Sequence, residues 1–244
     1  MARARPAPTV IAQVGDLVAE RDPRRPAGRL LRQGGMDSSY VDLADPRHLE
    51  FDYLRWIRIV LRAARARRVV HIGGGACALA RALAAEDPEG RQYVCEADPT
   101  VLALAREHLG LRRVPGLRVR HAEGRAFIAE QSATSWDAIV VDAYVGAAIP
   151  QALIDEAALA DVARVAPLGL VNVVDDRSAR VVRGVTAAMA GAYPSVWTLG
   201  GRAGNTIVAG CVRELDRARI AALAAADPSP ARLTAVSARS SRSS

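Results

Sequence analysis

The chain of 244 residues contains no lysine, because all 33 of its basic residues are arginine. This bias is typical of a GC-rich coding sequence, and we do not interpret it as phosphate recognition. Much of the net charge of +7 lies near the two ends of the chain. Residues 1–8 and 228–244 are rich in arginine, serine, proline or alanine and have no interleaved aromatic residues, so they are predicted to be disordered tails and not a nucleic-acid-binding surface.

Cysteine, aromatic residues and long apolar runs are also scarce. Cys77, Cys95 and Cys211 have neither disulfide-framework nor metal-ligand spacing, so we expect buried small side chains and no metal site. Aromatic residues make up 4% of the chain, which leaves a core of Ala, Val, Leu and Ile. No apolar run approaches the ~20 residues of a membrane span, and none follows the basic start as in a signal peptide. We therefore expect a cytoplasmic protein without a membrane partner.

The most informative segment present is a run of three glycines, Gly73, Gly74 and Gly75, between an apolar stretch and an alanine-rich helical pattern. Glycine permits the sharp strand-to-helix turn and close approach of a ligand, and the following helix offers N–H groups to it. Glu96 lies 21 residues after Gly75, at the end of a second apolar run. An acidic residue at this spacing is typical of one that binds ribose hydroxyls. Together these features predict a nucleoside-binding α/β domain.

The rest of the chain shows two kinds of pattern. Short β-like runs in residues 9–45 predict a small antiparallel sheet, and a helical pattern follows over 46–65. Alternating strands and helices then predict a parallel sheet covered on both faces, in an α/β domain over 46–227. The expected strands are 68–72, 91–96, 117–121, 136–142 and 168–174, and the expected helices are 76–86, 99–108, 123–131, 155–164 and 178–190. Two final strands, 196–199 and 206–212, are joined by a glycine-rich turn. This order predicts a Rossmann-like, seven-stranded methyltransferase-type sheet whose last strand is antiparallel.

Over residues 33–212 the chain resembles the spermidine synthases, which share the class I methyltransferase-like fold. Their glycine loop GGGDGG, Glu-x-Asp, GDG-like turn and Asp-x-x-Asp motif correspond here to four segments in the same order. These are Gly73-Gly74-Gly75-Ala76-Cys77-Ala78, Glu96-Ala97-Asp98, Ala122-Glu123-Gly124 and Asp142-Ala143-Tyr144-Val145. The resemblance implies a co-substrate that is S-adenosylmethionine or its decarboxylated form, an amine acceptor such as a polyamine, and no metal. It leaves a homodimer open.

Three departures fall on the amine half of the implied site. Ala76 replaces the loop aspartate that holds the aminopropyl ammonium in that family, and Val145 replaces the second aspartate of Asp-x-x-Asp. The family's Tyr-His-Glu is here Glu50-Phe51-Asp52, without the histidine. Desolvating ammonium groups without nearby carboxylates is costly, so we expect the amine site to be partly lost.

On the nucleoside side, the predicted binding residues are Gly73, Gly74, Gly75, Glu96, Asp98, Glu123 and Gly124. Asp98 precedes a helical pattern that begins with proline, so helix capping is an equal alternative to ligand binding. Glu123 is either the acidic residue that the family places against the adenine amino group or a residue favoured by the helix dipole. Gly124, its neighbour, is expected to ease the turn into the following helix.

On the acceptor side, Asp142 ends an apolar strand, and the resemblance implies that it deprotonates or orients the attacking amine. An ammonium ion is not nucleophilic until a base removes a proton. Tyr144 and Asp52 are the predicted substrate-binding residues, although packing is an alternative for Tyr144. His71 is expected to be a buried core residue, and Asp175 and Asp176 either face the site or solvate its rim.

Three functions remain open from the sequence. The first is a spermidine synthase-like transferase with a partly lost amine site. The second is an S-adenosylmethionine-dependent methyltransferase, which has no aminopropyl ammonium to anchor and so tolerates Ala76. The third is a non-catalytic binding or assembly protein that keeps the fold.

Overall fold

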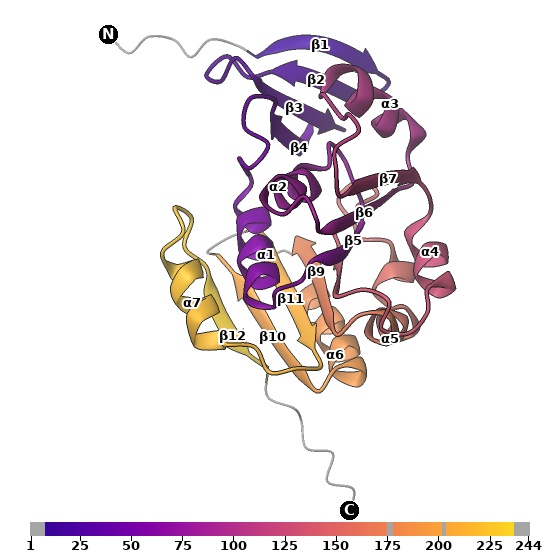
Figure 1. The fold of residues 1–244 in the computed structure, drawn as a ribbon, viewed down its shortest axis with the longest axis vertical. Coiled ribbons are helices and arrows are strands. Elements are labelled where there is room, and N and C mark those ends of the chain that lie inside the picture. Colours follow the sequence, from indigo (N-terminus) through magenta and orange to yellow (C-terminus); the bar gives the residue numbers. More distant parts are fainter. Residues whose placement is uncertain (1–7, 175–177, 202–203, 237–244) are drawn as a thin grey trace, which may run out of the picture.

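The structure, a computed structural model, describes residues 8–174, 178–201 and 204–236. A four-stranded sheet from the start of the chain stands above an eight-stranded sheet with helices on both sides (Figure 1). The small sheet has strands β1 (Thr9–Val14), β2 (Leu17–Arg21), β3 (Gly28–Gln33) and β4 (Met36–Asp42). Each strand pairs antiparallel with the next, which confirms the predicted antiparallel sheet.

Helix α1 (Asp52–Ala63) connects the two sheets. It begins six residues after Pro46, so the predicted helix over 46–65 is too long at its start. Residues 46–51 form a turn and an irregular segment, and Phe51, the residue before the helix, has an extended backbone. The apolar face of α1 packs into the core, because Trp56, Ile57 and Val60 are all buried.

The large sheet has the strand order β12-β10-β11-β9-β8-β5-β6-β7. Five neighbouring strands, β7 to β9 in this order, are parallel, whereas β11 runs antiparallel to β9 and to β10. This is the predicted methyltransferase-type sheet with an antiparallel last strand. The strand bounds are β5 (Arg68–Ile72), β6 (Arg91–Glu96), β7 (Leu117–His121), β8 (Ala138–Val141), β9 (Leu168–Val174), β10 (Ser195–Gly200), β11 (Asn205–Cys211) and β12 (Arg232–Ala235).

Strand β12 extends the predicted seven-stranded sheet to eight strands. It pairs antiparallel with β10 within the range 228–244, for which we expected only a disordered tail. The side chains of this four-residue strand are exposed or partly exposed, so it lacks the apolar pattern that identifies a buried strand. Two contacts join the preceding segment to α1: the Trp56 indole N–H donates to the Ser229 carbonyl at 2.9 Å, and Arg55 pairs with Asp227 at 3.0 Å.

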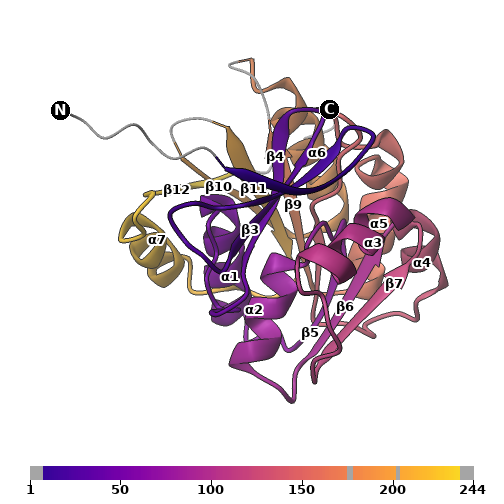
Figure 2. The ribbon, with the colours of Figure 1, turned by 90° about the horizontal axis from the view of Figure 1, so that it is seen from above.

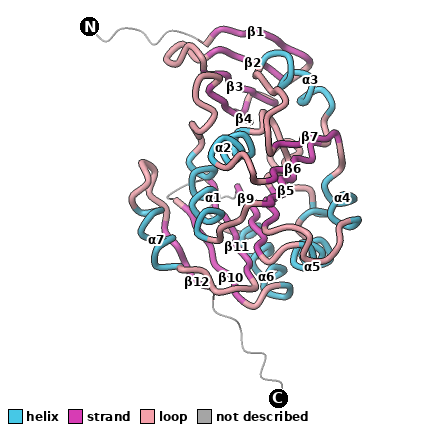
Figure 3. The backbone as a smooth tube through the Cα atoms, in the orientation of Figure 1, coloured by secondary structure: helices cyan, strands magenta, loops and turns pink. Residues whose placement is uncertain are grey.

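Helices cover both faces of the large sheet (Figures 2 and 3). Helices α1, α2 and α7 pack with one hydrophobic cluster, and α4, α5 and α6 pack with another on the opposite face. The remaining bounds are α2 (Ala78–Glu86), α3 (Pro99–His108), α4 (Gly124–Glu130), η1 (Gln151–Leu153), α5 (Glu156–Val165), α6 (Arg180–Ala192) and α7 (Arg217–Ala225).

The three cysteines are free and buried in these clusters, as predicted. Burial raises the pKa of the Cys77 and Cys95 thiols to about 12, which keeps both protonated. None of the helices described is long and apolar enough to cross a membrane.

Candidate functional site

A cavity of about 1040 Å³ lies at the carboxyl ends of the parallel strands, under the edge of the small sheet. In open α/β sheets this end of the strands is where ligands bind. All ten residues that the sequence assigned to the site line this cavity. They are Asp52, Gly73, Gly74, Gly75, Glu96, Asp98, Glu123, Gly124, Asp142 and Tyr144.

The glycine loop is shaped by close backbone contacts. Gly73 has a φ of +89°, and a Cβ atom there would lie 2.2 Å from the backbone oxygen of Asp142. Gly75 also has a positive φ, +49°, and a Cβ atom there would lie 3.0 Å from the Ser39 Cβ. Gly73 therefore lets the end of β5 lie against the residue that follows β8, and Gly74 lets it lie against β6. Gly75 brings the loop under Ser39 of β4.

Replacing Gly73 by alanine should destabilise the protein and displace Asp142. The φ of +89° is strained for any L side chain, and the added Cβ meets backbone that cannot rotate away. We expect the free energy of unfolding to fall by about 2 kcal/mol or more. Gly146→Ala is the control, because it also has a positive φ (+60°) but nothing lies within 4 Å of its Cβ position. Equal losses in urea unfolding of the two variants would contradict the role of the close contact.

Glu96 braces the glycine loop from the end of β6. Its Oε2 atom accepts hydrogen bonds from the Gly74 and Gly75 N–H groups at 2.8 and 2.9 Å. Its Oε1 atom accepts from the Asp98 N–H at 2.9 Å. The two loop amides are therefore held by the protein itself. Glu96 keeps lone-pair capacity on Oε1, since each carboxylate oxygen can accept more than one hydrogen bond.

Backbone N–H groups that are free for a ligand are expected directly after the loop, at the first turn of α2. The Ala76 N–H donates to Ser39 Oγ at 3.0 Å and the Cys77 N–H to the Gly74 carbonyl at 2.6 Å. Helix α2 then begins at Ala78 with no side-chain cap. The first N–H groups of a helix need partners from outside it. Ala78, Leu79 and Ala80 line the cavity, so a polar ligand group can meet this turn.

Asp98 and Glu123 both act as helix caps. Asp98 Oδ1 accepts from the N–H groups of Thr100 and Val101 at the start of α3. Glu123 accepts from the Arg125 and Ala126 N–H groups at the start of α4, at 3.0 and 2.7 Å. Both carboxylates also line the cavity. Capping is thus observed for each, and their ligand contacts remain a prediction.

Gly124 is a packing glycine as well as a wall residue. It is buried, and a Cβ atom there would lie 2.3 Å from Ile72 Cγ2 at the end of β5. The small residue lets α4 approach the strand that leads into the glycine loop.

Asp142, directly after β8, lies in a hydrogen-bond network. The Tyr53 hydroxyl donates to its Oδ2 at 3.0 Å, and the Asn172 amide donates to its Oδ1 at 2.8 Å. The Asn205 amide in turn donates to Asn172 Oδ1 at 3.0 Å. Desolvation raises the pKa of Asp142, and the two hydrogen bonds it accepts lower the pKa and oppose part of that rise. A carboxylate fixed on one side and desolvated is suited to accept a proton from a ligand.

Tyr53 and Asn172 are site residues that sequence reasoning did not assign. Burial, and next the Asp142 charge, raise the pKa of Tyr53 well above its ordinary value, so it stays a hydrogen-bond donor. Asn172 is 1% exposed. It is the one polar side chain in the apolar strand β9, and this anomaly was a signal that could have identified it.

Tyr144 is positioned by backbone contacts. Its hydroxyl donates to the Asn172 carbonyl at 2.9 Å and accepts from the Val174 N–H at 2.8 Å. The ring therefore lines the cavity while the hydroxyl holds the loop after β8 onto β9.

The residues of the implied amine site differ in their positions relative to the cavity. Ala76 is fully buried, and Val145 is 76% exposed at the cavity rim. Asp52 lines the cavity at the first turn of α1 and accepts from the Tyr53 N–H at 2.8 Å. Asp175 and Asp176 lie outside the described residues.

The charge of the cavity is opposite to that of the protein. Eight carboxylate residues and no arginine occur among its described lining residues, in a chain of net charge +7. The carboxylates are Asp16, Asp37, Glu50, Asp52, Glu96, Asp98, Glu123 and Asp142. His71 adds no charge, because burial lowers its pKa to about 4. The contact between its ring Nε2 and Gln92 Oε1, at 3.0 Å, raises the pKa and opposes part of this shift. Such a site favours a cationic ligand. No cluster of metal-ligating side chains occurs in the described part of the chain.

Solved structures match this fold over nearly its whole length. A probable spermidine synthase from Corynebacterium glutamicum aligns with a TM-score of 0.83 and 27% identity, over 94% of this chain and 91% of that one. The chain has the fold of the spermidine synthases. The carboxylate-lined cavity thus lies in a spermidine synthase-like, S-adenosylmethionine-dependent transferase fold.

More distant structures share the fold alone. A spermidine synthase in complex with the transition-state analogue AdoDATO matches with a TM-score of 0.67 and 17% identity, over 84% of this chain and 74% of that one. Human methyltransferase-like protein 13 in complex with SAH matches with a TM-score of 0.53 and 19% identity, over 66% and 79%. No protein-family model and no curated protein matches the chain.

Proposed function

We propose that the protein is a transferase that binds S-adenosylmethionine or its decarboxylated form and alkylates an amine. The observation that carries the proposal is the cavity charge, with eight carboxylates and no arginine among the described lining residues. Both the sulfonium donor and an ammonium acceptor are cations, and a negatively charged, partly desolvated site favours both. The fold supports the same donor class.

The nucleoside is assigned to the glycine-loop side of the cavity. Glu96 is the acceptor for the ribose hydroxyls, since its Oε1 retains lone-pair capacity beside the loop. Glu123 and Gly124, at the start of α4, are assigned to the base. Only glycine fits at Gly73, where a Cβ atom would meet the Asp142 backbone, and this close approach sets the course of the loop along the cavity wall.

The reaction is assigned to the Asp142 side. The amine nitrogen attacks a carbon bound to the sulfonium, the C–S bond breaks, and its electron pair goes to sulfur as a neutral thioether. Asp142 takes the proton that the ammonium must lose before it becomes nucleophilic. Tyr53 and Asn172 hold the carboxylate in place, and positioning of the two substrates supplies the rest of the acceleration.

The acceptor is held by fewer carboxylates than the spermidine synthase pattern has, because Ala76 and Val145 supply none. Asp52 remains next to Tyr53, and Asp37 and Glu50 line the same cavity. We assign these three carboxylates to binding of the amine acceptor. With two carboxylates fewer, the site should bind its amine less tightly than a site with the complete spermidine synthase pattern binds a long polyamine.

A methyltransferase is the second candidate, and two observations favour it. Ala76 cannot hold an aminopropyl ammonium, and the uncapped first turn of α2 suits the carboxylate that S-adenosylmethionine has and its decarboxylated form lacks. Mass analysis of products from a mixture of amines separates the alternatives. A mass gain of an aminopropyl group supports aminopropyl transfer, and a gain of a methyl group supports a methyltransferase. The absence of product with either donor supports a non-catalytic binding protein.

Donor choice is a direct test of these residues. Because no carboxylate occupies position 76, we predict no strong preference for the decarboxylated donor over S-adenosylmethionine in calorimetric titration. A preference of a hundredfold, about 2.7 kcal/mol, would contradict this prediction. Ala76→Asp should create such a preference, and Ala103→Asp, at an exposed position of α3 outside the cavity, is the control.

A further inference from the structure

A second cavity, of about 390 Å³, lies on one face of the small sheet. Glu20 on β2 pairs in register with Leu30 on β3, and Leu30 pairs with Tyr40 on β4. Residues that face each other across neighbouring strands project from the same side of a sheet. All three line the second cavity, and Phe51 closes it from the segment that leads into α1.

Glu20 is a buried carboxylate with no ion-pair partner among the described residues. The residue is 7% exposed, and its Oε2 atom has no hydrogen-bond partner among the described residues. A buried charge that is neither paired nor hydrogen-bonded is costly. Within the described part of the chain, the small sheet therefore carries a buried carboxylate oxygen that lacks a partner and that a cation would suit.

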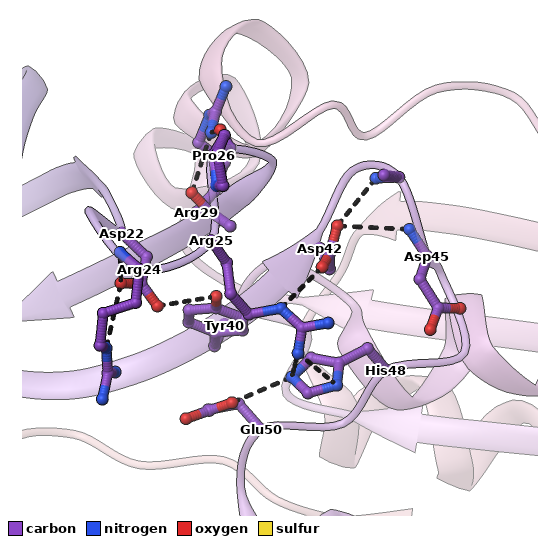
Figure 4. Close-up of polar contacts among 12 residues, drawn as sticks. Asp22, Arg24, Arg25, Pro26, Arg29, Tyr40, Asp42, Asp45, His48 and Glu50 are labelled. Carbon is purple, nitrogen blue, oxygen red and sulfur yellow. Dashed lines mark hydrogen bonds and ion pairs between the residues drawn. The ribbon is translucent and has the colours of Figure 1, made fainter.

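The other carboxylates of this cavity have partners, as far as the structure describes the chain. Asp22 accepts from the Tyr40 hydroxyl and pairs with Arg24 (Figure 4). Glu50 lies 2.9 Å from the His48 ring in the same view, and Asp37 pairs with Arg32 at 3.0 Å. No ion pair joins Glu20 to Arg21 or Arg24, the two described arginines that line the cavity.

We propose that the second cavity binds an organic ammonium ion, with Glu20 as its counter-charge and apolar walls around its carbon chain. Leu30 and Phe51 supply apolar surface beside the carboxylate, and the Tyr40 and Phe51 rings can attract a cation through their faces. A metal ion fits poorly, because the described residues contain no cluster of ligands that could hold one.

This site is separate from the main cavity but adjacent to it. Asp37, Glu50 and Phe51 line both cavities, whereas Glu20 lines only the second and Asp142 only the first. The proposal does not depend on a transferase activity, and variants at Glu20 and Asp142 distinguish the two sites.

The test is calorimetric titration of the full chain with hexylammonium chloride, with 1-hexanol as the uncharged ligand of similar shape. We expect Glu20→Gln to raise the Kd of the hexylammonium site at least tenfold, whereas Asp142→Asn alters only the separate binding of an amine in the main cavity. Glu130→Gln, which removes a charge from an exposed residue outside both cavities, is the matched control. Equal affinity of wild type and Glu20→Gln, or equal affinity for hexanol and hexylammonium, would overturn the proposal.

Stability separates loss of binding from loss of fold. Without the amine, Glu20→Gln and Glu20→Met should melt at or above the wild-type temperature, because each removes an unpaired buried charge. With the amine, wild type should gain stability by mass action and the two variants should not. Glu20 variants that melt well below wild type would show that the carboxylate has a partner within the protein, and the proposal would then fail.

Discussion

Replacing Asp142 by asparagine is expected to lower turnover by about two to four powers of ten, the usual range for loss of a general base. Asparagine keeps the shape of the side chain and can still accept the hydrogen bond from Asn172, but it cannot take a proton. Nucleoside affinity should change little, because Asp142 lies on the acceptor side of the cavity. Single-turnover assays with saturating donor measure the loss, and calorimetry measures the affinity.

Asp45→Asn is the matched control for this substitution, since Asp45 is exposed and lines neither cavity. If amine alkylation is detectable and the Asp142→Asn variant turns over at the wild-type rate, Asp142 is not the base. If wild type alkylates no amine with either donor, the binding-protein function takes first place.

The same substitution should raise stability at neutral pH. The pKa of Asp142 is raised above its ordinary value in the folded protein, so the folded state binds this proton more tightly than the unfolded state does. The associated stability is present below the ordinary pKa, about 3.9, and is lost as the pH rises through the raised value. Above the ordinary pKa, the desolvated carboxyl group therefore costs the folded state stability. Asp142→Asn removes that cost. We therefore expect the variant to have a higher midpoint of thermal unfolding than wild type and a lower turnover in activity assays.

Much of the large sheet could be predicted because its central strands, β5, β8 and β9, are nearly continuous apolar runs. The predicted strand over 68–72 and the predicted helix over 99–108 agree with β5 and α3 in both bounds. Burial on both faces produces such runs, and single helices between them require parallel pairing. β12 could not be predicted in this way, since it is a short edge strand with exposed or partly exposed side chains that is held by pairing to β10.

The position of the site was more predictable than the detailed contacts of its residues. Residues at the carboxyl ends of strands converge by topology, which is why Glu96 and Asp142 line one cavity. Their partners could not be predicted, because Tyr53 reaches Asp142 across 89 positions of sequence. Capping by Asp98 was weighed from the sequence, whereas the Glu96 bonds to Gly74 and Gly75 depend on how β6 lies beside the loop.

Replacing Glu96 by alanine is expected to weaken binding of methylthioadenosine and S-adenosylhomocysteine at least a hundredfold, or about 2.7 kcal/mol. The substitution removes the assigned ribose acceptor and also the brace on the Gly74 and Gly75 N–H groups. Wild type should show a rise in thermal midpoint with either nucleoside, and the variant should show none. Because two loop amides lose their acceptor, the ligand-free variant should also lose about 1–3 kcal/mol of stability while keeping its fold.

Glu96→Gln separates the brace from the ribose contact. Its side-chain oxygen can still accept from the two glycine amides, whereas its NH₂ group cannot accept from a ribose hydroxyl or from the Asp98 N–H. We therefore expect a smaller loss of ligand-free stability than for Glu96→Ala, because only the Asp98 N–H loses its acceptor, together with weakened nucleoside binding. Neither quantity should change for the exposed control Glu130→Gln. A Glu96→Gln variant that binds as tightly as wild type would assign Glu96 to the loop alone. A wild-type protein with no thermal shift at millimolar nucleoside would remove the nucleoside site from the glycine loop altogether.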